Sequence, residues 1–182
     1  MEGLGREAQN HLAPLDLLER GPLLSVSGRA VAARLPRHIP ERMAGRARSV
    51  LAKTGTPVKI DAQIVDAACP GAGLFLVARY REITCGFSAL GKPGKPSESV
   101  ADEATAALLE HLHAGAALDA HLADQILLPL SFAAGPSRFS AERLTSHLAT
   151  NSWVIEQFGV ARVAWAPADR NTVIVTVSPQ GQ

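Results

Sequence analysis

The chain has 182 residues, of which 47% are hydrophobic and 19% charged, a composition typical of a globular protein with enough apolar side chains for a core. Its 18 lysines and arginines and 17 acidic residues give a formal net charge of +1, which neither favours nor excludes an anionic partner. No apolar run approaches the roughly 20 residues of a membrane span, and the first residues lack the apolar stretch of a signal peptide. Cys69 and Cys85 follow no metal-binding or redox spacing. We therefore expect a cytoplasmic protein with no membrane partner and no structural disulfide.

The first half of the chain predicts a strand, a helix and three further strands. Residues 22–36 are apolar, β-branched and alternating, as in a strand. From residue 37 to 54 apolar residues recur at a spacing near 3.6, which predicts a helix ended by Gly55 in a left-handed conformation. Three more strands are expected at 57–66, 73–82 and 83–91, and the second of these is apolar enough to be central.

A loop rich in glycine and proline, GKPGKPS, then precedes a second helix, which Ser97 or Ser99 is suited to cap. Apolar residues at helical spacing predict one buried face on it: Val100, Ala104, Ala107, Leu108 and Leu112.

The second half predicts helix, strand, helix and hairpin. A helix capped by Asp119 is expected to bend at Pro129, since proline removes a backbone donor. A short strand at 144–148, a short helix at 151–158 and a hairpin follow. The first of these two helices, capped by Asp119, should bury Leu122, Ile126, Leu130 and Ala133. The order is β-α-β-β-β-α and then α-β-α-β-β, which predicts an α+β fold with two small sheets.

One near-match to a phosphate-binding loop lies at Gly86, Gly91 and Lys92, which fit G-x-x-x-x-G-K after a predicted strand. The next residue should carry a hydroxyl for magnesium and an N–H for phosphate, and Pro93 supplies neither. A simple turn from strand to helix is the favoured interpretation.

Three histidines raise the possibility of a zinc protein. His111 and His113 are two residues apart, so on a helix they point about 200° from each other and cannot face one ion. Neither they nor His121 have a cysteine or carboxylate pair to complete a tetrahedral site. We expect surface histidines and no metal site.

A run of basic residues spans the first predicted helix. Several of them share the face opposite Ile39 and Met43, as RNA-binding residues would. The basic residues are Arg37, Arg42, Arg46, Arg48 and Lys53, against only Glu41. A solvated helix face has the same pattern and is favoured.

Two polar groups remain in apolar surroundings. Asp124 and Gln125 lie in a leucine-rich helix, with His121 one turn before Gln125 on the same face. His147 precedes a predicted helix whose free N–H groups, near Asn151, would attract an anion such as phosphate. Neutral imidazole is a competent nucleophile near pH 7. The residues alone leave a catalytic and a buried structural histidine equally open.

At these two places the sequence resembles the C-terminal half of RNA 3'-terminal phosphate cyclases. The resemblance rests first on HLADQILLPL at 121–130 and SHLATNSWVIEQF at 146–158, in that order. It extends to PLDLLERG at 14–21, ARLPRHIPER at 33–42 and ITCGFSALGKPGKPSESVADEA at 83–104. It therefore covers nearly the whole chain after about residue 11.

The resemblance implies an ATP-dependent ligase that converts an RNA 3'-phosphate end into a 2',3'-cyclic phosphodiester, using a divalent metal, expected to be Mg²⁺. His147 would attack the α-phosphate of ATP and become adenylated. The family's nucleotide-binding segment corresponds to His121, Leu122, Ala123, Asp124 and Gln125. The family often has an aromatic residue where His121 stands.

The resemblance also implies a domain plan. Residues 1–22 would be a remnant of the large domain, 23–115 a small inserted α/β domain, and 116–182 the final repeat of the large domain. Family members are about twice as long. We therefore expect the missing N-terminal repeats as a partner of this chain, or self-association through the apolar surface that those repeats would cover. The alternative function is a non-catalytic cyclase-like module of RNA processing or ribosome assembly.

Overall fold

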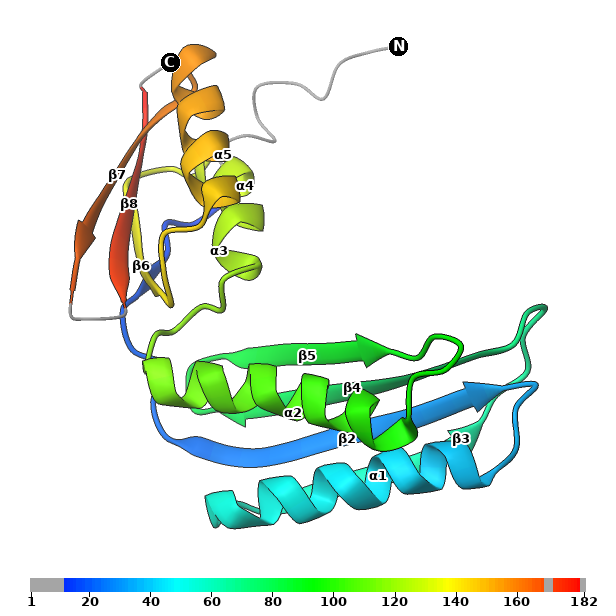
Figure 1. Cartoon of the computed structure of the whole chain (residues 1–182). Coiled ribbons are helices and arrows are strands. Elements are labelled where there is room, and N and C mark those ends of the chain that lie inside the picture. Colours follow the sequence, from blue (N-terminus) through cyan, green and yellow to red (C-terminus); the bar gives the residue numbers. More distant parts are fainter. Residues whose placement is uncertain (1–11, 169–171, 181–182) are drawn as a thin grey trace. The chain divides into compact units, whose positions relative to one another are not determined.

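The computed structural model describes residues 12–168 and 172–180, which form two compact units (Figure 1). The central unit is Gly21–His113, and the terminal unit comprises the described residues up to Arg20 together with those from Ala114 on. The predicted α+β class and the predicted existence of two small sheets are confirmed.

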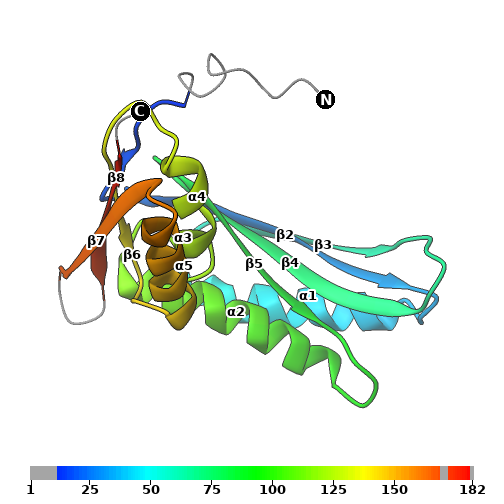
Figure 2. The same cartoon turned by 90° about the horizontal axis from the view of Figure 1, so that it is seen from above.

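The central unit contains a four-stranded sheet with two helices on one face (Figure 2). The strands lie in the order β3 (Val58–Ile64), β2 (Leu23–Ala33), β4 (Gly71–Tyr80), β5 (Thr84–Leu90). β2 and β3 run parallel, and the other neighbouring pairs are antiparallel. The helices are α1 (His38–Leu51) and α2 (Ser97–Ala114), and a short 3₁₀ turn, η2 (Ala52–Thr54), extends α1. As expected, β4 is a central strand.

The core of the central unit lies between this sheet and the two helices. Met43, Ala47 and Leu51 of α1 are fully buried, which confirms the predicted face of this helix. Gly55 ends the helical segment with φ of 70°, as its position predicted. On α2 the predicted Val100, Ala104 and Leu108 are buried, whereas Ala107 is exposed.

His111 is also buried on α2, so its predicted surface position is wrong. Its ring centroid lies 5.7 Å from that of Tyr80 and 5.4 Å from that of Phe87, two side chains of the sheet. The helical spacing that buries Ala104 and Leu108 continues to His111, one turn further on the same face. The neighbouring His113 is exposed, as predicted.

The terminal unit has a second four-stranded sheet. Its order is β1 (Asp16–Leu17), β6 (Ser137–Ala141), β8 (Val173–Pro179), β7 (Ala161–Pro167). The predicted hairpin is confirmed, since β7 and β8 pair in antiparallel register. β1 is parallel to β6, and a strand of two residues carries no alternation from which it could be predicted.

Two predictions for the terminal unit are wrong. The single helix expected after Asp119 is two short helices, α3 (Leu122–Gln125) and α4 (Leu127–Leu130). Pro129 has no N–H to bond the carbonyl of Gln125, and its ring crowds that carbonyl, so one helix cannot run through this stretch. The strand expected at 144–148 is instead the beginning of α5 (Ser146–Gln157).

Candidate nucleotide site in the terminal unit

Helix α5 begins earlier than predicted because Thr145 caps it. The Thr145 hydroxyl oxygen accepts a hydrogen bond of 3.0 Å from the backbone N–H of Leu148. The buried face of the helix is formed by Leu148, Ser152 and Ile155. His147 therefore lies in the first turn, and its side chain is exposed to solvent rather than packed in a core.

The start of α5 combines an imidazole with free backbone donors. The N–H groups of Ser146 and His147 donate no hydrogen bond to the described residues, since the first turn of a helix has no intrahelical acceptors. Such donors and the positive end of the helix dipole favour an anion. The anion site expected near Asn151 is wrong, because Asn151 lies in the middle of the helix. The favoured position is beside His147 itself.

The predicted nucleotide segment lies at the start of α3. One carboxylate oxygen of Asp119 accepts hydrogen bonds from the N–H groups of His121, at 2.8 Å, and Leu122, at 2.9 Å, which confirms the predicted cap. In the rest of the segment Ala123 is buried, Asp124 is half-buried, and His121 and Gln125 are exposed.

Helices α3 and α5 pack against each other within the terminal unit, so the two sequence motifs belong to one region (Figure 1). A buried carboxylate that the sequence did not single out connects them. Glu142, between β6 and α5, accepts a hydrogen bond of 3.2 Å from the N–H of Ala120, just before α3. Its own N–H bonds the carbonyl of Leu118. Arg20 holds the same segment by donating to the carbonyl of Ala116 at 3.0 Å.

Comparison with known proteins identifies the family. Residues 18–113 match the insert domain of RNA 3'-terminal phosphate cyclase (RTC). The chain belongs to the RNA 3'-terminal phosphate cyclase family. It is 54% identical over 166 residues to an RNA 3'-terminal phosphate cyclase of Methylococcus capsulatus, covering 91% of this chain and 46% of that protein.

Two further relatives have the same name. The cyclase of Trichormus variabilis is 42% identical, over 91% of this chain and 47% of its own length. That of Methanosarcina mazei is 42% identical over 77% and 38% respectively. The chain thus spans about half the length of the curated cyclases it matches.

In this cyclase-family chain the basic run on α1 is largely neutralised. Arg42 makes two hydrogen bonds with the Glu98 carboxylate, at 2.7 and 2.8 Å, and Arg46 pairs with Asp102 at 2.7 Å. These pairs join α1 to α2. They raise the pKa of both guanidinium groups, chiefly through the hydrogen bonds, and the bond from Arg42 lowers the pKa of Glu98.

The two other arginines of the run are also engaged. Arg37 pairs with Glu41, and Arg48 donates to the carbonyl of Ile60 at 2.7 Å. The favoured interpretation of this run as a structural, solvated face therefore agrees with these interactions.

The near-match to a phosphate-binding loop forms a turn from β5 into α2. The N–H of Gly91 bonds the carbonyl of Ala72 at 2.9 Å, and Lys95 pairs with Glu103. The strand-to-helix interpretation is confirmed.

Within residues 12–168 and 172–180, no cluster of three or more histidine, cysteine, aspartate or glutamate side chains is arranged to hold a metal ion. Within the same ranges, none of the helices combines the length and apolarity that crossing a membrane requires. Neither Cys69 nor Cys85 forms a disulfide with a described residue, and the first is exposed and the second buried.

Proposed function

We propose that this chain acts as the C-terminal portion of an RNA 3'-phosphate cyclase, with His147 as its nucleophile. The observation that carries the proposal is an exposed imidazole in the first turn of α5, beside backbone N–H groups with no acceptor among the described residues. A histidine placed there is accessible to solvent, and the neighbouring backbone N–H groups favour the binding of a phosphate group. The family membership supports the same conclusion.

The proposed reaction has three steps. An imidazole nitrogen of His147 attacks the α-phosphorus of ATP, a P–N bond forms, and pyrophosphate leaves as its P–O bond breaks. An oxygen of the RNA 3'-phosphate then attacks the same phosphorus, so AMP moves to the RNA and the imidazole is released. Finally the 2'-hydroxyl oxygen attacks the terminal RNA phosphorus, loses its proton to water, and expels AMP as the cyclic phosphodiester closes. The covalent intermediate divides one hard displacement into easier ones.

The side chains around His147 would position the nucleotide. The free N–H groups of Ser146 and His147 would donate to α-phosphate oxygens, where negative charge is stabilised during transfer. Asp124 and Gln125 would hold the nucleotide, flanked by His121, Leu122 and Ala123. We expect Mg²⁺ to arrive as the complex with ATP.

The domain plan is part of the proposal. The inserted domain would be residues 23–115, preceded by a remnant of the large domain at 1–22 and followed by its final repeat at 116–182. Helix α5 exposes Trp153 and its neighbour Val154, and Phe158 follows just after the helix. Side chains of this kind are a surface for the remaining N-terminal repeats or, in their absence, for a second copy.

The test is incubation with ATP radiolabelled at the α-phosphate. It uses the chain itself and a chimera in which the unmatched part of the Methylococcus capsulatus relative is restored. A phosphoramidate predicts label on the protein that is labile in acid and stable in alkali. His147→Ala should remove it, and Ser146→Ala, an exposed neighbour in the same turn, should keep it. A folded chimera that takes no label would refute the proposed nucleophile.

A second candidate function is a non-catalytic, cyclase-like module of RNA processing or ribosome assembly. Membership of the family is compatible with this function as well as with catalysis. The labelling experiment separates the two. A module of this kind would leave the chimera unlabelled, and His147→Ala would leave its binding to RNA unchanged.

A further inference from the structure

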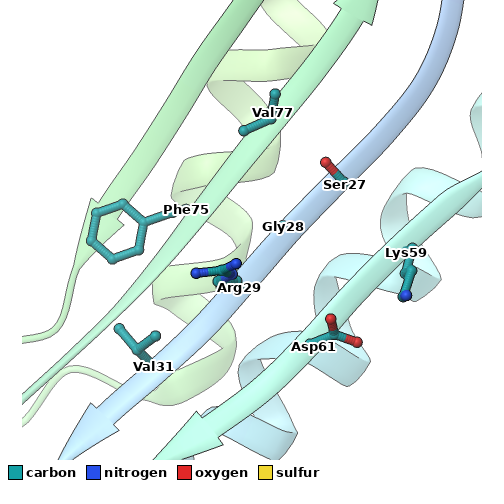
Figure 3. Close-up of a pocket in the computed structure, with 8 residues that line it drawn as sticks. All are labelled: Ser27, Gly28, Arg29, Val31, Lys59, Asp61, Phe75 and Val77. Atoms are coloured by element: carbon teal, nitrogen blue, oxygen red, sulfur yellow. The ribbon is translucent and has the colours of Figure 1, made fainter. Parts of the chain in front are cut away.

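The central unit leaves one face of its sheet open. Helices α1 and α2 cover the other face (Figure 2). A groove of about 650 Å³ lies on the open face, across β3, β2 and β4 (Figure 3). Phe75 and Val77 of β4 point into it with 45% and 38% of their surfaces exposed. A sheet face with an exposed aromatic ring resembles a surface for flat ligands.

The neighbours of these apolar side chains are small, so the sheet itself does not cover them. Phe75 lies opposite Ser88 on β5, and Val77 lies between Ser27 on β2 and Gly86 on β5. The remaining neighbour of Phe75 is Arg29, on β2 (Figure 3). An aromatic ring beside a guanidinium group and surrounded by small side chains can receive a further planar group on its free side.

The charge of the open face is positive and unpaired. Arg29, Lys59 and Arg79 are exposed on this face, against one carboxylate, Asp61. None of the three cations makes a hydrogen bond or ion pair with the described residues. The arginines of α1 are different, since Arg42 and Arg46 are bonded to acidic side chains of α2. The open sheet face therefore carries cations that can bind an external anion, whereas Arg42 and Arg46 of the basic helix are already engaged.

We infer that the open sheet face binds a single-stranded segment of RNA away from its reacting end. A base stacks on Phe75, and Arg29 and Lys59 contact backbone phosphates. This inference rests on the proposed function for the identity of the nucleic acid. Paired bases are already stacked on each other, so a base that packs on Phe75 must be unpaired.

The experiment measures binding of the intact chain to a fluorescent single-stranded oligoribonucleotide by anisotropy. Phe75→Ala should weaken binding about 5- to 100-fold, the factor expected when one base has no aromatic ring on which to stack. Phe75→Tyr should restore it. The double substitution Arg29→Gln with Lys59→Gln should reduce the slope of log affinity against log salt by about 1.4, or about 0.7 for each phosphate that the protein no longer neutralises.

Two matched controls lie elsewhere on the chain. Phe158→Ala removes an aromatic ring that is 78% exposed in the terminal unit, and Arg37→Gln removes an exposed cation just before α1. Both should leave RNA affinity unchanged. RNA ending in a 3'-hydroxyl should bind as tightly as RNA ending in a 3'-phosphate, and Phe75→Ala should still be labelled by ATP wherever the unsubstituted protein is. A result that contradicts RNA binding by the sheet face can thus be distinguished from one that contradicts His147 as the nucleophile.

Two results would overturn the inference. The unsubstituted chain could bind no single-stranded RNA at low salt, or Phe75→Ala could bind it with unchanged affinity. If in the second case Phe75→Ala also converts a dimer into a monomer in sedimentation velocity, the face is an interface between copies of the chain.

Discussion

The two units of this chain differ in which surfaces their own side chains leave uncovered. The central unit joins its helices through Arg42–Glu98 and Arg46–Asp102, and it exposes a sheet face whose cations make no ion pair with the described residues. The terminal unit exposes the larger aromatic side chains, with Trp153 60% and Phe158 78% exposed. A face that carries exposed cations favours an anionic partner, whereas large exposed apolar side chains favour a protein partner. The central unit is therefore the better candidate for a nucleic-acid surface, and the terminal unit for assembly with further protein.

The histidines show the same contrast. His111 of the central unit is fully buried between the rings of Tyr80 and Phe87. His147 of the terminal unit is exposed at a helix start with free N–H groups. Only the second can reach a substrate without rearrangement of a core. The two residues are of the same type, and what distinguishes them is their position on the helix, one on a buried face and the other in an exposed first turn.

The largest expected effect comes from Gly28→Ala, which should disrupt the central unit selectively. A Cβ atom at Gly28 would lie 2.6 Å from the Phe75 carbonyl oxygen and 2.8 Å from a methyl carbon of Leu76. Relief requires movement of β4, so we expect a decrease of about 1 to 3 kcal/mol or more in unfolding free energy. Hydrogen exchange followed by mass spectrometry should show reduced protection within Gly21–His113 and retained protection in the terminal unit.

Gly86→Ala is the matched control for that change. Its added Cβ would meet only the Leu76 carbonyl oxygen, at 4.0 Å, so the sheet has room for it. An equal decrease of protection in both units after Gly28→Ala would mean that they unfold together, and the comparison between independent units would then be wrong.

A smaller effect, on association rather than folding, is expected from Trp153→Ser combined with Phe158→Ser. Both side chains are mostly exposed, so their removal should change the unfolding free energy little. Self-association measured by sedimentation velocity should decrease, since the apolar area available to a second copy is reduced. Phe75→Ala is the control in the central unit and should leave association unchanged. Association that persists in the double variant would place the interface elsewhere.

Much of the central unit could be predicted because its elements are long and periodic. The face of α1, the left-handed Gly55 and the central position of β4 all follow from local patterns. The ion pairs between α1 and α2 could not, since they join residues 56 positions apart. Without them the basic run remained open to an RNA-binding interpretation.

The terminal unit was harder to predict because its elements are short and its pairings distant in sequence. β1 pairs with β6 across 122 residues. The Glu142 carboxylate accepts a hydrogen bond from the backbone N–H of Ala120, a contact that no sequence pattern indicates. The error at α5 was avoidable. Thr145 is a favourable cap, and Leu148, Ser152 and Ile155 have the spacing of one helix face. The role of His147 stays a prediction, while its placement at a strand end was wrong.

The smallest expected effect concerns the pairs that set the central unit apart, and it depends on pH. The hydrogen bonds from Arg42 hold the pKa of Glu98 below its ordinary value of about 4.5, while Arg42 stays protonated because its own pKa is raised. A carboxylate with a lowered folded-state pKa stabilises the fold above its ordinary pKa and loses this contribution as pH falls through the folded-state value. Glu98→Gln should therefore lower Tm at pH 7, and the difference in Tm should shrink below about pH 4.5. Glu19→Gln, an exposed glutamate of the terminal unit with no ion pair to the described residues, should show no such trend in calorimetry. A difference that stays constant down to the lowest pH at which the protein folds would show that the pair between α1 and α2 contributes through packing and not through charge.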